Sequence, residues 1–299
     1  MLEPNPRRRT ALIETVGLLV AMIGLAALLG ALIGGPFGIA LALGMAVFGA
    51  FGGSNAPTAL ILRMWRARPL SRWQAPRLRG MVDELARRAN LPEAPLLFLL
   101  PSPTPNAAAL GTPDQPVLVV SRGLLQQLSP REMYGVLAHE MAHVAHGDVT
   151  TMRLTASLAQ VIGALSLAGM ITWFASVLLA GDEIAAMPFT ALLLFASAPT
   201  LVTLMQLALS RQREFAADAR AVQLAGDAGG LASALLKLEH WRSRMAMLAG
   251  RMVGMPPSWL ATHPATPARI ERLRDIAGFE PYRPVRRPPQ RLMTVDPWL

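Results

Sequence analysis

Two histidines lie four residues apart in the run HEMAH, with a glutamate next to the first, at His139, Glu140 and His143. Residues four apart on a helix share one face, so both imidazoles can bind one metal ion at a distance of about 2 Å. Glu140 then lies beside the metal, where a carboxylate can take a proton from an attacking water and pass it to a leaving amine. The pattern predicts hydrolysis at a site that holds one Zn²⁺ ion per chain.

A catalytic zinc ion needs a third protein ligand and an open position. The chain has no cysteine, and the pattern HExxHxxGxxH fails because His146 and Val149 stand where it requires glycine and histidine. Glu214, in SRQREFAADA, is a candidate ligand, with Asp218 four residues later on the same helical face. That pair can supply one ligand and one carboxylate that orients a ligand histidine. A solvated, salt-bridged helix surface explains the same spacing equally well.

The sequence also predicts the helix that carries HEMAH. Ser129 is a candidate N-cap, Pro130 occupies the first helical position and Glu132 completes a capping box. The helix should run to His146 and stop at Gly147.

The composition indicates a membrane protein, since 53% of residues are hydrophobic and only 16% are charged, against about 25% charged in soluble domains. No charged residue lies within 15–62, 155–180 or 184–209, and Gly-Gly-Pro at 34–36 interrupts the first stretch. These lengths predict four transmembrane helices in two hairpins. The first run is too long for a signal peptide, so we expect a retained anchor.

Lysine and arginine flank the apolar stretches on one side only, and the short turns inside the hairpins have none. This asymmetry predicts that both termini and the polar segments face the cytoplasm. The net charge of +9 comes from scattered residues without an aromatic platform, so we expect no nucleic-acid partner. A transporter is disfavoured because the apolar stretches have no ionisable group.

The predicted fold class is a mainly α integral membrane protein with a small β-sheet. An amphipathic helix is expected at 76–90, and short β-prone runs lie at 96–100 and 117–121. Further helices are expected at 210–225, 231–248 and 262–276. The predicted parts are a cytoplasmic N-terminus (1–14), a transmembrane hairpin (15–56), a first peptidase segment (57–153), a second hairpin (154–209), a second peptidase segment (210–279) and a Pro/Arg-rich tail (280–299).

Three segments, LAHEMAHVAHGD, SRQREFAADA and THPATPARIERL, together resemble the HtpX-type membrane zinc endopeptidases, which are relatives of the CAAX prenyl-protein endopeptidase. The resemblance covers nearly the whole chain. It implies a gluzincin-like peptidase domain in the cytoplasm, in a bacterial plasma (inner) membrane protein. It also implies quality control, with misfolded or damaged membrane proteins, or unfolded chains, as substrates at the lipid bilayer.

The resemblance also assigns roles to individual residues. Glu214 becomes the third zinc ligand, and Asp218 the carboxylate behind a ligand histidine. In PNAAALG, Asn106 and Ala107 match a segment that pairs with the substrate backbone, although a plain polar loop is the alternative. His263 and Arg269 match positions near the cleft, where a cation can stabilise an oxyanion; helix capping and packing are the alternative there.

A second class of function stays open. A membrane assembly factor with a structural zinc site would need four protein ligands, and the sequence reveals no fourth. The sequence does not set an oligomeric state.

Overall fold

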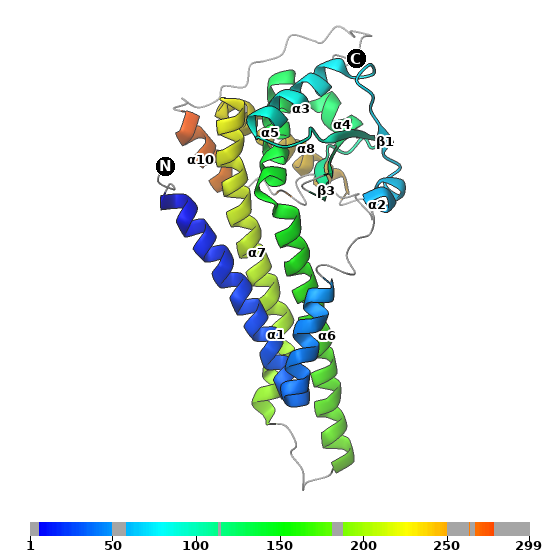
Figure 1. Ribbon diagram of the computed structural model, residues 1–299, viewed down its shortest axis with the longest axis vertical. Helices are drawn as coiled ribbons and strands as arrows, with labels where there is room; N and C mark the ends of the chain where they lie inside the picture. The colour runs from blue at the N-terminus through cyan, green and yellow to red at the C-terminus, as the bar shows by residue number, and fades with distance from the viewer. Residues whose placement is uncertain are drawn as a thin grey trace. The chain divides into compact units, whose positions relative to one another are not determined.

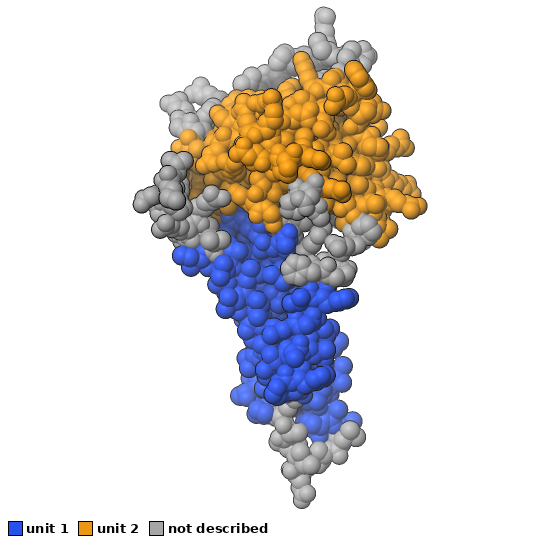
Figure 2. Space-filling model, viewed as in Figure 1, with its two compact units in different colours: residues 1–56, 150–213 blue, residues 57–149, 214–299 orange. Residues whose placement is uncertain are grey.

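The computed structural model describes residues 6–49, 58–112, 115–180, 188–249, 263 and 267–277. The chain divides into two compact units, one formed by 1–56 and 150–213 and the other by 57–149 and 214–299 (Figure 2). We call them the apolar-helix unit and the HEMAH unit. The chain is mainly helical, with one small mixed sheet.

In the apolar-helix unit, α1 (Pro6–Val47) reverses direction at the Gly-Gly-Pro group (Figure 1). Gly34 and Gly35 have non-helical backbone angles, and the φ of 57° at Gly35 is one that glycine adopts without strain. A Cβ added to Gly30 would lie 2.5 Å from the carbonyl oxygen of Gly38. The two halves of α1 therefore contact each other through their backbones, which requires small residues.

Within the residues that the structure describes, three helical stretches are long and apolar enough to cross a membrane: Ile13–Val47, Thr150–Leu178 and Phe189–Ala225. They belong to α1, α6 (Asp148–Ala180) and α7 (Phe189–Ala225). Four spans were predicted, and the difference arises at α1, which makes up one of the three stretches although non-helical backbone at Gly34 and Gly35 separates its two halves. The rest of the predicted second span, at 50–56, lies outside the described residues. Four crossings therefore stay a prediction.

The sheet of the HEMAH unit has the strand order β1-β2-β4-β3. Its strands are β1 (Arg68–Pro69), β2 (Leu96–Leu100), β3 (Ala107–Thr112) and β4 (Gln115–Ser121). The predicted runs form β2 and β4, which pair in parallel, while β3 pairs antiparallel with β4. The sequence did not predict β3, because its alanines and glycine have low β propensity.

The helices of the HEMAH unit are α2 (Thr58–Met64), α3 (Pro76–Arg88), α4 (Arg122–Gln127), α5 (Pro130–His146), α8 (Ala228–Ala249) and α10 (Pro267–Ala277). The predicted amphipathic helix is α3, which buries Leu78, Val82 and Leu85. These side chains join one core with the apolar residues of α5 and α8.

Helix α5 lies at the centre of this core and has the predicted bounds. The capping box is complete, since Ser129 Oγ accepts from the Glu132 amide and the Glu132 carboxylate accepts from the Ser129 amide. Glu132 also accepts hydrogen bonds from Ser233 and Lys237 of α8, at 2.6 and 2.5 Å. The helix start is thereby tied to its neighbour, which fixes the position of the HEMAH residues.

Candidate metal centre

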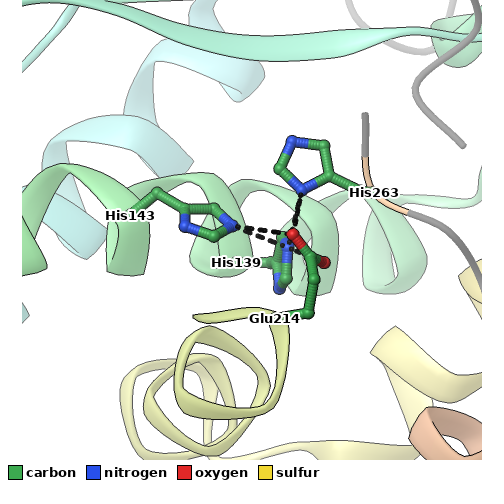
Figure 3. Close-up of side chains that lie close together, drawn as sticks. All are labelled: His139, His143, Glu214 and His263. Carbon is green, nitrogen blue, oxygen red and sulfur yellow. Dashed lines mark hydrogen bonds and ion pairs between the residues drawn. The ribbon is translucent and has the colours of Figure 1, made fainter. Parts of the chain in front are cut away.

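Four side chains converge at the middle of the HEMAH unit: His139 and His143 from α5, Glu214 from α7, and His263 (Figure 3). His139 Nε2 lies 3.2 Å from His143 Nε2 and 3.4 Å from Glu214 Oε2, and His143 Nε2 lies 3.6 Å from Glu214 Oε1. Ligands bound to zinc tetrahedrally at about 2.0–2.1 Å are about 3.4 Å apart. The two imidazoles and the carboxylate therefore fit one zinc ion.

His263 belongs to the same cluster. Its Nδ1 lies 2.8 Å from Glu214 Oε1 and 3.4 Å from His139 Nε2. The sequence placed this residue near the cleft and gave no fourth ligand. The structure instead brings a third imidazole to the point where the other donors meet, because His263 lies beside the two histidines of α5 in the folded chain.

His139 is fully buried between carboxylates. Its Nδ1 lies 2.9 Å from Asp218 Oδ1. Burial alone would lower the pKa of this imidazole, but hydrogen bonds and charge interactions with Asp218 and Glu214 outweigh burial and raise the pKa to about 9. In the metal-free protein His139 is therefore cationic at neutral pH, and a metal ion has to displace that proton.

His143 has the opposite electrostatics. Burial and the neighbouring imidazoles of His139 and His263 lower its pKa to about 3, so the ring is neutral. Its Nδ1 lies 2.6 Å from Asp148 Oδ2. The sequence interpretation gave Asp148, the last residue of the segment LAHEMAHVAHGD, no role of its own. The available signal was a carboxylate that follows a helix-ending glycine, five residues after the histidine.

Arg269 of α10 is buried against the same carboxylates. Its Nε and Nη2 each donate to an Asp218 oxygen at 2.7 Å, and its Nη1 lies 2.6 Å from Glu214 Oε2. Burial alone would lower the pKa of the guanidinium. The interactions with the carboxylates outweigh burial and raise the pKa above its ordinary value, so the charge is retained. The three groups form one ionic network. A role of Arg269 near the cleft, in binding substrate or stabilising an oxyanion, stays a prediction, while its contacts with Glu214 and Asp218 are direct.

Glu140 faces strand β3. The Ala109 amide donates to Glu140 Oε2 at 3.1 Å, and His263 Nε2 lies 3.7 Å from Glu140 Oε1. The carboxylate is thus within reach of both the ligand cluster and the strand. That is the position required of a base that acts on a water near the metal.

The two residues predicted to bind substrate, Asn106 just before β3 and Ala107 at its start, differ in their backbone contacts. Asn106 uses both its backbone groups with Ser121, donating to Oγ at 2.8 Å and accepting from N at 2.9 Å. Because pairing alternates along an antiparallel ladder, the amide and carbonyl of Ala107 point away from β4. Ala107 therefore has backbone groups on the edge of β3 that faces away from β4, although the residue is only 1% exposed, whereas both backbone groups of Asn106 are used by Ser121.

This geometry agrees with comparisons to known proteins. Residues 72–277 match Peptidase family M48. The chain belongs to this family. Its curated M48 relatives include a protein named Protease HtpX homolog from Acidiphilium cryptum, which is 37% identical over 90% of this chain and 98% of its own length. Proteins of the same name from Acaryochloris marina and Burkholderia mallei are 38% and 36% identical over 81% and 89% of this chain.

The crystal structure of S. mikatae Ste24p is also similar. The match covers 90% of the present chain and 66% of the Ste24p chain, with 20% identity and a TM-score of 0.47. The family, the three membrane-competent helices and the His/Glu cluster together make the protein a membrane-bound metallopeptidase. The predicted resemblance to HtpX-type proteases is confirmed.

Proposed function

We propose that the protein is a zinc endopeptidase that cleaves misfolded or damaged membrane proteins at the cytoplasmic face of a bacterial plasma membrane. The observation that carries this proposal is the spacing of His139, His143 and Glu214, at 3.2 to 3.6 Å, with Glu140 beside them. Two imidazoles and one carboxylate leave an open position, as a catalytic zinc site requires.

Metal binding and proton transfer are carried out by different residues of the chain. His139, His143 and Glu214 would hold the ion, which would supply polarisation of the scissile carbonyl and a water that is nucleophilic at neutral pH. Glu140 takes the proton of the attacking water and delivers it to the nitrogen of the leaving amine. The Ala109 amide holds the Glu140 carboxylate at 3.1 Å, so the base is oriented before substrate arrives.

The position of β3 as the last strand of the sheet supports an extended substrate. A peptide strand would pair with the outward amide and carbonyl of Ala107, as in β-augmentation. Ala107 is 1% exposed, so this pairing requires the groups that cover it to move aside. Pairing of this kind needs a free backbone, which folded helices and central strands do not offer. Unfolded or damaged chains therefore suit this edge better than intact proteins.

The cytoplasmic placement rests on the distribution of basic residues. Arg63, Arg66 and Arg68 follow the first apolar segment, and Arg211 and Arg213 follow the last one. Such residues are enriched on the cytoplasmic side of membrane segments. The HEMAH unit lies next to these arginines in sequence, so we place it in the cytoplasm.

The variant Glu140→Gln tests the mechanism. Purified in detergent with added zinc, it should bind one equivalent of zinc and lose self-cleavage and casein cleavage by at least about 10²–10⁴-fold, the usual contribution of a general base. Glu93→Gln is a matched control, since Glu93 is an exposed glutamate outside the cluster. Cleavage by Glu140→Gln at the parent rate would refute the assignment.

One observation favours a second candidate, a structural zinc site in a membrane assembly factor. His263 supplies a fourth protein donor, within 4.8 Å of the other three ligand atoms, and closed four-ligand sites are typical of structural zinc. X-ray absorption on the zinc-loaded protein separates the two functions. Two imidazoles, one carboxylate and a water support the peptidase, whereas three imidazoles and one carboxylate with no water, together with no cleavage, support the structural site.

A further inference from the structure

Asp148 lies where α5 ends and α6 begins. Gly147 closes α5 in the left-handed conformation, with φ 65° and ψ 28°, and Asp148 is the first residue of α6. The turn at Gly147 redirects the chain so that a residue five positions after His143 returns to its ring. Asp148 is buried, with 7% of its surface exposed.

The two nitrogens of His143 face different partners. Nδ1 lies 2.6 Å from Asp148 Oδ2, while Nε2 faces His139 Nε2 at 3.2 Å and Glu214 Oε1 at 3.6 Å. A neutral imidazole has one N–H, and an ionised carboxylate only accepts hydrogen bonds. The contact with Asp148 therefore requires the hydrogen on Nδ1, which leaves the lone pair of Nε2 directed at the ligand cluster.

We propose that Asp148 is a positioning residue that fixes the tautomer and the ring orientation of His143 as a zinc ligand. This inference rests on the proposed zinc site. A carboxylate behind a ligand histidine holds the ring in place and increases its basicity toward the metal. Asp148 does for His143 what Asp218 does for His139, whose Nδ1 lies 2.9 Å from Asp218 Oδ1.

The two carboxylates are held in different ways. Asp218 is fixed by two hydrogen bonds from Arg269, so its position depends on α10. Asp148 is carried by the backbone that leaves α5, so its position depends on the turn at Gly147. Each ligand histidine therefore has its own support, and loss of one support should leave the other in place.

A purely structural role for Asp148 is the rival explanation. An acidic residue in the first turn of a helix stabilises that helix through its dipole. Asp227 provides the matched control, because it precedes α8, accepts from the Gly230 amide and pairs with Arg131 on the surface, away from the ligand cluster. Replacing either aspartate removes a charge near a helix start, but only Asp148 contacts a ligand.

The test measures zinc affinity on the full-length protein in detergent, by competition with a chelator. Asp148→Ala should weaken zinc binding by about 10- to 100-fold, the range seen when such carboxylates are lost. Asp148→Asn keeps an acceptor without the charge and should recover part of this loss. Asp227→Asn should leave zinc affinity unchanged.

A thermal melt of each metal-free variant shows the structural contribution. The proposal is overturned if Asp148→Ala binds zinc within about twofold of the parent, or if it only melts earlier, as Asp227→Asn does. Glu140→Gln, measured beside them, separates this inference from the peptidase mechanism. If that variant binds zinc and still cleaves, the mechanism fails while the role of Asp148 stands; if the parent binds no zinc, both fail.

Discussion

In the apolar-helix unit, large apolar side chains such as Phe37, Leu167 and Leu178 are exposed. In the HEMAH unit, the buried residues include Arg269 and Asp218, which form an ionic network with Glu214. Lipid accepts an apolar surface, whereas water favours a surface of charges with apolar residues inside. Most of the buried charges of the second unit gather at the site, although Glu132 at the start of α5 is also buried and pairs there with Lys237.

The close contacts inside the apolar-helix unit differ in kind from those inside the HEMAH unit. In the apolar-helix unit, backbones meet at Gly30 and Gly38, and Ser157 Oγ donates to the Ala46 carbonyl at 2.9 Å. In the HEMAH unit, ion pairs of Arg269 with Glu214 and Asp218 join α10 to α7. Small residues allow packing where no hydrophobic force acts between helices, while ionic pairs at the site orient ligands. The difference predicts which substitutions should be costly in each unit.

The largest effect is expected for Arg269→Met. It leaves the buried carboxylates of Asp218 and Glu214 without their cation, and breaking a buried pair in this way costs about 3–5 kcal/mol. The metal-free protein should unfold at a markedly lower temperature in a detergent melt. Arg242→Met is the control, because the Arg242–Glu239 pair lies on the exposed surface and pairs of that kind contribute about 0–1 kcal/mol. Equal effects of the two variants would contradict the ionic network.

Gly30→Ala should be the next most damaging change. The added methyl group meets the Gly38 backbone at 2.5 Å, and overpacking of this kind costs about 1–3 kcal/mol. Gly24→Ala is the matched control, because a Cβ at Gly24 has no atom within 4 Å. There the better helix propensity of alanine should stabilise by up to about 1 kcal/mol. Equal melting temperatures would show that the two halves of α1 do not pack at Gly30.

The pH dependence of zinc binding tests the effect of the buried charges of the HEMAH unit on the metal site. His139 has a pKa of about 9 in the metal-free protein, and His143 one of about 3. Between pH 8 and pH 6, zinc should therefore displace about one proton, from His139, and its apparent affinity should fall about tenfold for each unit that the pH falls. Asp218→Asn removes a carboxylate that raises the pKa of His139, so its slope should be shallower. Proton release measured by calorimetry checks both.

The features that the sequence predicted depend on residues close together in the chain, and those that it missed depend on residues far apart or on the path of the backbone. HEMAH and the capping box at Ser129 depend on neighbours within one helix, so their spacing was enough. Glu214 became a ligand only through the family resemblance, because spacing alone suits a salt-bridged surface equally well. His263 and Asp148 reach the cluster through tertiary structure and through the turn at Gly147. No periodic pattern in the sequence reports either contact.

The smallest effect is expected for Leu167→Ala in the apolar-helix unit. Leu167 is 56% exposed, and a side chain that faces lipid loses little on truncation because lipid tails are as apolar as leucine. The unfolding free energy in bilayer-like bicelles should change by less than about 0.5 kcal/mol, as for most surface substitutions.

Leu137→Ala in α5 is the matched control. Leu137 is fully buried, and loss of a buried leucine side chain costs about 2–5 kcal/mol. A cost at Leu167 as large as that at Leu137 would mean that Leu167 packs against protein, and the comparison between the two units would fail at that position.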